Sequence, residues 1–169
     1  MDVIVLLAVG ISFFTDVTRR KIYNWVTLSA MSLGLTLHFI DNGMSGLKTS
    51  FGGLLTGLGI LFIPFLLNGI SAGDVKLLAA IGALKGAEFV LQTALFAAIF
   101  GGIYIFIYLL QKGKLGETTK RLWQVLKLVA ITGGKQRYGW LPPIREGMTT
   151  VVPYGTAIFA GTVLTLLVR

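Results

Sequence analysis

Six apolar segments, separated by shorter polar ones, run along the chain. Three of them carry no acidic or basic side chain over most of their length: residues 51–67, 89–110 and 151–168. Three weaker segments cover residues 3–15, 24–40 and 75–84. Since roughly 20 apolar helical residues cross a bilayer core of about 30 Å, the pattern predicts an all-α, polytopic membrane helix bundle with about six transmembrane helices.

The composition agrees with a membrane protein, because 54% of the 169 residues are hydrophobic, 13% are charged and the mean hydropathy is +0.81. Charged residues follow the first apolar segment without a small-residue cleavage site, so we expect a retained helix and not a signal peptide. No internal repeat is evident, which predicts a single domain over residues 1–169.

The basic residues are distributed unequally over the two sides that six spans would define. Three lie on one side: Lys48, Lys85 and Arg169. Twelve lie on the other: Arg19, Arg20, Lys21, Lys76, Lys112, Lys114, Lys120, Arg121, Lys127, Lys135, Arg137 and Arg145. Because basic residues accumulate in cytoplasmic loops, this count predicts a multi-pass protein of the plasma (inner) membrane, with both termini outside.

The long connection over residues 111–150 is then cytoplasmic. In it Lys120, Arg121 and Lys127 recur at helical spacing against an apolar face: Leu122, Val125, Leu126 and Val129. This pattern predicts a basic amphipathic helix on the inner leaflet. We therefore attribute the net charge of +8 to topology and to attraction by an anionic inner leaflet, and we expect no nucleic-acid partner.

Two acidic residues, Asp16 and Asp74, lie beside apolar segments on the predicted cytoplasmic side. Asp16 follows Asp2 by fourteen residues and Asp74 precedes Glu88 by fourteen, which is about 21 Å of helix at ~1.5 Å per residue. If Asp2 and Glu88 mark the outer boundary, the two acids lie at one depth and can meet. An ionised acid is costly at the edge of a bilayer, so this pair is a candidate functional site.

Each acid also has a purely structural interpretation. Asp16 could be an interfacial acid paired with Arg19 or Arg20, which lie at i+3 and i+4 on the same helical face. Asp74 follows Gly73 and precedes an apolar run, as a helix N-cap residue does. These interpretations explain the residues without any chemistry.

Other residues are expected to serve packing or the interface. Gly73 lets another segment approach Asp74 closely, and Lys76 extends toward the lipid headgroups. Gly53 and Gly57 form a small-residue face typical of close helix packing. The single histidine, His38, lies near the outer end of its segment and is expected to be an interfacial residue. Because the chain also has no cysteine, we expect no metal site and no cofactor.

An ordered set of short motifs extends from the first apolar segment to the last. Its members are Asp16, Arg19, Arg20, Ile22 and Asn24, then Gly73-Asp74-Val75-Lys76-Leu77, then Pro153-Tyr154-Gly155. In this order they resemble the type IV prepilin peptidases, which are membrane aspartic proteases of the GxGD class. Two positions depart from the family pattern: Ser71 replaces the first glycine of GxGD, and Tyr23 replaces the proline usual before the asparagine.

The resemblance implies an aspartic endopeptidase with Asp16 and Asp74 as catalytic residues. It implies substrate-binding or supporting roles for five others: Arg19, Arg20, Asn24, Gly73 and Lys76. Larger members of the family carry paired Cys-x-x-C motifs that bind zinc, and they also methylate the new N-terminus. Without cysteine, this chain resembles the short, peptidase-only branch of the tight-adherence (Flp-type) pilus or archaeal type, so N-methylation is not expected.

Two carboxyl groups that share a site cannot both ionise easily, so one acts as a base toward water and the other donates a proton. Which aspartate takes which role stays open, because the pair titrates as a unit. The implied substrate is a prepilin or pilin-like precursor, cut between a short basic leader and an apolar helix. Such precursors carry a glutamate after the cut, for which Arg19 and Arg20 are better placed than Lys76, unless these arginines only fix the topology.

Two other classes of function stay open beside the peptidase. A small membrane transporter or channel could use the glycine-rich helices and the two acids as an ion path, although the two halves show no inverted-repeat symmetry. A non-catalytic pilus-assembly membrane scaffold could use the same packing faces. Homo-oligomerisation also stays open.

Overall fold

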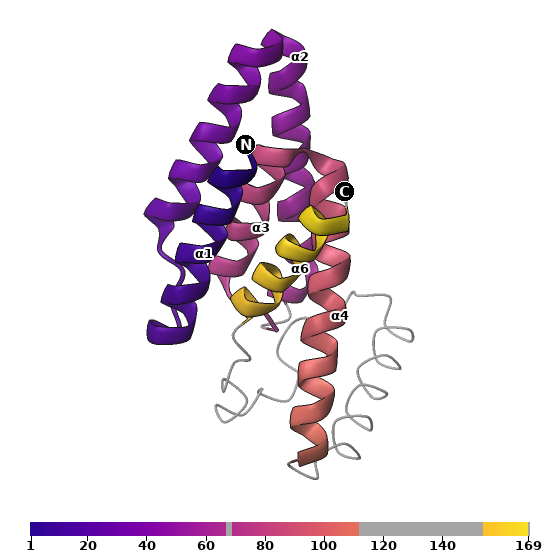
Figure 1. Cartoon of the computed structure of the whole chain (residues 1–169). Helices are drawn as coiled ribbons and strands as arrows, with labels where there is room; N and C mark the ends of the chain where they lie inside the picture. Colours follow the sequence, from indigo (N-terminus) through magenta and orange to yellow (C-terminus); the bar gives the residue numbers. More distant parts are fainter. Residues whose placement is uncertain (67–68, 112–153, 169) are drawn as a thin grey trace, which may run out of the picture. The chain divides into compact units, whose positions relative to one another are not determined.

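The computed structural model describes residues 1–66, 69–111 and 154–168, and in these residues it is all-helical, without strands (Figure 1). The helices are α1 (Asp2–Arg19), α2 (Asn24–Leu66), α3 (Ala72–Lys85), α4 (Ala87–Gln111) and α6 (Tyr154–Val168). The predicted all-α class is therefore confirmed. The predicted cytoplasmic connection over residues 111–150, with its amphipathic helix, falls outside the described residues apart from residue 111.

Each of the six predicted apolar segments falls on a helix in its described residues. The segments at residues 24–40 and 51–67 both lie in α2. This helix is interrupted at Gly43, where the backbone has φ 57° and ψ −137°. Glycine adopts a positive φ at little steric cost, so Gly43 permits this break. The six segments thus correspond to six helical stretches, although their crossing of a bilayer stays a prediction.

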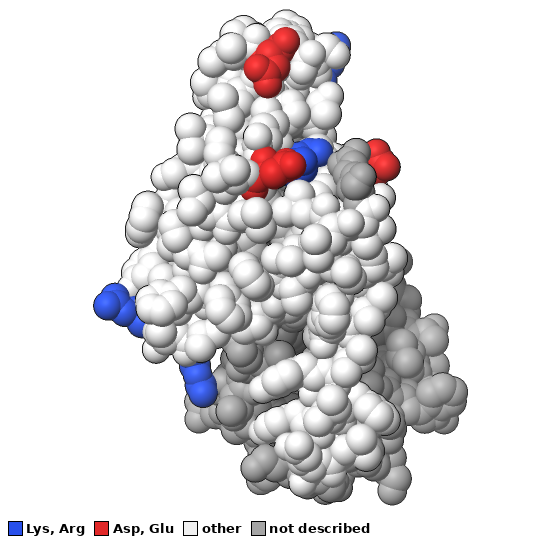
Figure 2. All heavy atoms as spheres, viewed as in Figure 1, with Lys and Arg blue, Asp and Glu red and all other residues white. Residues whose placement is uncertain are grey.

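By length and composition, α2 and the Ala87–Tyr108 part of α4 could cross a membrane, and Tyr154–Val168 is a shorter apolar helix. Large hydrophobic side chains such as Phe14, Ile63 and Leu95 are exposed on α1, α2 and α4. On the face shown in Figure 2, a broad uncharged surface separates charged side chains near the two ends of α1. Such a surface is typical of helices that face lipid.

The chain forms two compact units. One consists of Met1–Gly101 and Pro153–Arg169, and the other of Gly102–Val152. Of the second unit, the structure describes only the last turns of α4, residues 102–111. Both Asp16 and Asp74 belong to the first unit, so the candidate site lies within one compact body.

Helix α3 lies at the centre of the first unit and contacts α1, α2 and α6 (Figure 1). From Asp74 to Leu84 every side chain except that of Lys76 is buried. A helix that is apolar on all sides is buried either in a protein core or in lipid. Neighbouring helices cover α3, and this burial places Asp74 inside the unit.

Glycines of α2 allow its backbone to approach that of α3 closely. A Cβ atom on Gly34 or Gly57 would lie 2.6 Å from the carbonyl oxygen of Ala83 or Leu78, respectively. One on Gly53 would overlap the carbonyl oxygen of Gly82. The expected packing role of Gly53 and Gly57 is confirmed, and the contact is tight enough to exclude even a methyl group.

This contact predicts different effects for two neighbouring glycines. Gly53→Ala should lower the free energy of unfolding by about 1–3 kcal/mol or more, because the new methyl group must push two backbones apart. The Cβ of Gly52→Ala meets nothing within 4 Å, so this control should be neutral or slightly stabilising. Thermal unfolding in detergent measures both, and equal melting temperatures would contradict the packing.

Candidate active site

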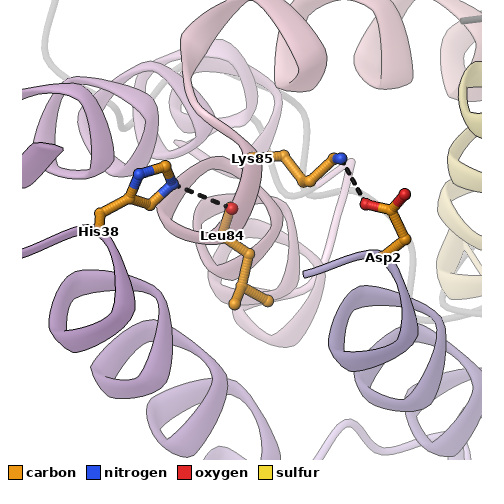
Figure 3. Close-up of polar contacts among 4 residues, drawn as sticks. All are labelled: Asp2, His38, Leu84 and Lys85. Carbon is orange, nitrogen blue, oxygen red and sulfur yellow. Dashed lines mark hydrogen bonds and ion pairs between the residues drawn. The ribbon is translucent and has the colours of Figure 1, made fainter. Parts of the chain in front are cut away.

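The start of α1 and the end of α3 are joined by an ion pair, and a histidine of α2 binds the end of α3 (Figure 3). Lys85 Nζ forms an ion pair with Asp2 Oδ1, which joins the end of α3 to the start of α1. His38 Nε2 donates to the carbonyl oxygen of Leu84 at 3.1 Å, so the only histidine binds a helix end. Among the described residues, no three or more His, Cys, Asp or Glu side chains group in a way that could hold a metal.

Figure 1 shows α1 and α3 running in opposite directions, and the ion pair joins the start of α1 to the end of α3, so the last turns of α1 lie near the first turn of α3. Asp16 and Asp74 occupy these positions, and their charges interact electrostatically. Both are buried, with exposed fractions of 8% for Asp16 and 2% for Asp74. The structure thus places the two acids within electrostatic range of each other, as their equal spacing from Asp2 and Glu88 predicted.

Asp74 is held by the residue three positions before it. The N-cap of α3 is Ser71, and Asp74 occupies the N3 position of a capping box. Asp74 Oδ2 accepts two hydrogen bonds from Ser71, one from the backbone N–H at 3.1 Å and one from the hydroxyl at 2.8 Å. The interpretation of Asp74 as the N-cap itself is therefore wrong, because the serine upstream takes that position.

Asp16 is held by the first turn of α6. Its Oδ2 accepts a hydrogen bond from the backbone N–H of Gly155 at 3.1 Å. A Cβ atom on Gly155 would lie 2.6 Å from the same oxygen, so a larger residue could not make this contact without moving the carboxyl group. The neighbouring Tyr154 interacts electrostatically with Asp74, so the start of α6 reaches both acids.

The side chains of the two arginines after Asp16 do not pair with its carboxyl group. Arg19 is exposed and donates from Nη1 to the Tyr23 hydroxyl at 2.7 Å. Arg20 is also exposed, and it ends α1 in the left-handed region with φ 51°, where its backbone N–H donates to the Asp16 carbonyl oxygen. Neither forms an ion pair with Asp16, so the pairing proposed for this interfacial acid is wrong: the side chains extend outward while Asp16 turns inward.

The turn between α1 and α2 packs on the start of α3. Lys76 Nζ donates to Asn24 Oδ1 at 3.0 Å, which links α3 to the first residue of α2. A Cβ atom on Gly73 would lie 3.0 Å from Cβ of Ile22, so Ile22 is the group that approaches this glycine. Asn24, Gly73 and Lys76 thus support the surroundings of Asp74, and none of them is hydrogen-bonded to its carboxyl group.

Two contacts to the acids go beyond the predictions made from the sequence. The hydroxyl of Ser71 binds Asp74, and a serine three residues before an acid and ahead of an apolar run is a capping-box signal that could have identified it. The contact of Gly155 with Asp16 has no signal in local spacing, because the two residues lie 139 positions apart; only the motif Pro153-Tyr154-Gly155 marks this glycine.

Two buried carboxyl groups that interact in this way suit acid–base chemistry on a water molecule. Repulsion between like charges favours a state in which one group is ionised and the other is protonated. The ionised group can activate water as a base, and the protonated group can donate to an oxygen or nitrogen of the substrate.

Comparison with protein families gives a match over residues 3–106 to a model described as the type IV leader peptidase family. The match contains Asp16 and Asp74 and ends before α6. No match was found among curated proteins or among solved structures.

Proposed function

Because the chain belongs to the type IV leader peptidase family, we propose that it is a membrane aspartic endopeptidase that removes the short basic leader from type IV prepilin-like precursors on the cytoplasmic face of the inner membrane. Membership itself indicates a peptidase. The observation that supports the finer proposal is that Asp16 and Asp74 are both buried and lie within electrostatic range of each other at one end of α1 and α3.

In the proposed reaction, one carboxylate removes a proton from water as the oxygen attacks the scissile carbonyl carbon. The other carboxyl group protonates the carbonyl oxygen, which gives a tetrahedral diol. When the diol collapses, the first group passes the proton taken from water to the leaving amine and the second takes a proton from a diol hydroxyl, so the pair again holds one proton. Burial keeps competing water away and strengthens both interactions. The proposal covers cleavage alone, without N-methylation, since the methylating relatives carry Cys-x-x-C motifs and this sequence has no cysteine.

The position of the acids suits a substrate cut at the junction of a basic leader and an apolar helix. Asp16 lies within about one turn of the exposed Arg19 and Arg20, which we expect on the cytoplasmic side from the distribution of basic residues. Lys76 is already bound to Asn24 and Arg19 to Tyr23, whereas the Arg20 side chain forms no hydrogen bond or ion pair with the described residues. We therefore favour Arg20 as the partner of an acidic group in the precursor.

The first test is the removal of each carboxylate. Asp16→Asn and Asp74→Asn should each lower leader removal by at least about 100-fold, since general acid and base catalysis contribute 10²–10⁴-fold. The measurement is a gel shift of a candidate pilin precursor co-expressed with the protein. Asp41→Asn, which changes an exposed acid on α2, is the matched control and should cleave normally. Activity surviving in either single variant would refute the proposed pair.

The second test concerns the contact between α6 and Asp16. Gly155→Ala should lower cleavage by about 100-fold, because a displacement of about 1 Å in a catalytic group has that effect on rate. Gly59→Ala is the control, since a Cβ there meets nothing within 4 Å. Equal rates for the two alanine variants, at equal protein levels, would show that the Gly155 contact is not needed.

The third test is the orientation in the membrane. Cysteines introduced at Ser45, which is exposed beside the break in α2, and at Thr132, in the connection outside the described residues, should differ in labelling on intact cells. A membrane-impermeant thiol reagent should label the first and not the second. The opposite pattern would place the two acids on the wrong side for a cytoplasmic leader.

A further inference from the structure

Ser71 stands at the one position of the GxGD-like motif where this chain carries a side chain in place of glycine. Its hydroxyl lies 2.8 Å from Asp74 Oδ2 and its backbone N–H lies 3.1 Å from the same oxygen. We propose that Ser71 is a positioning residue, whose hydroxyl fixes the Asp74 carboxyl group for catalysis. This inference rests on the proposed function and adds a residue to that site.

The geometry of the two bonds gives the hydroxyl its role. Both donors bind Oδ2 and neither binds Oδ1, so Ser71 holds the carboxyl group by one of its two oxygens. Asp74 is only 2% exposed, so the donors that orient it must come from the protein. A glycine at position 71 would keep the N–H donor and lose the hydroxyl.

Ser71 also caps α3, so its effect on catalysis must be separated from its effect on the helix. The two effects differ between replacements. At an N-cap, alanine is unfavourable while glycine is nearly as good as serine, yet both lack the hydroxyl. Threonine keeps the hydroxyl and is an acceptable N-cap. Three substitutions at one position can therefore distinguish orientation of Asp74 from stabilisation of α3.

The experiment measures kcat and KM for leader removal by purified Ser71→Ala, Ser71→Gly and Ser71→Thr. A positioning role predicts that kcat falls about tenfold or more in both the alanine and the glycine variants, with little change in KM. Threonine should restore most of the activity. Ser29→Ala, which removes an exposed hydroxyl bonded within α2, is the control and should not change kcat.

Two results would overturn the inference. Wild-type kcat in Ser71→Gly with a loss only in Ser71→Ala would assign Ser71 to helix capping alone. Wild-type kcat in both would leave the hydroxyl without a role.

A second measurement does not depend on cleavage. Melting temperatures of Ser71→Ala, Asp74→Ala and the double variant form a cycle, and the two single effects should not add if the side chains interact. Additive shifts would contradict the contact. The wild-type protein could cleave no precursor while the cycle still shows coupling. This result would refute the proposed function and would still support the contact between Ser71 and Asp74.

Discussion

The close backbone contact between α2 and α3 is the constraint on which the rest of the first unit depends. Helix α3 is buried on nearly every side, and only glycines such as Gly53 and Gly82 let its backbone come close enough to that of α2. This packing places Lys85 against Asp2 at one end of α3 and Asp74 near Asp16 at the other. A larger distance between α2 and α3 would move Asp74 relative to Asp16.

Much of this arrangement could be predicted from the sequence. Hydropathy indicated every described helix, the motifs indicated the family that the model match confirms, and equal spacing from Asp2 and Glu88 indicated that Asp16 and Asp74 would meet. These are properties of segment length and order. They depend little on which side chains touch.

The individual contacts could not be predicted in the same way. Sequence spacing placed Arg19 and Arg20 on the face of Asp16, but the left-handed end of α1 and the Tyr23 hydroxyl hold them outside. The donor to Asp16 comes from the other end of the chain. Both acids are bound by first turns of helices, Asp74 within α3 and Asp16 by α6, where the helix dipole stabilises negative charge. This offsets part of the repulsion between the two acids.

The bond from Gly155 to Asp16 has a consequence for the order in which the protein matures. Helices α1 and α3, with both acids, are synthesised well before Tyr154 and Gly155. Until α6 arrives, Asp16 lacks its backbone donor and the side of it that α6 covers stays open. The site is therefore completed late in synthesis, because a chain that has not yet reached α6 carries both acids without the Gly155 donor.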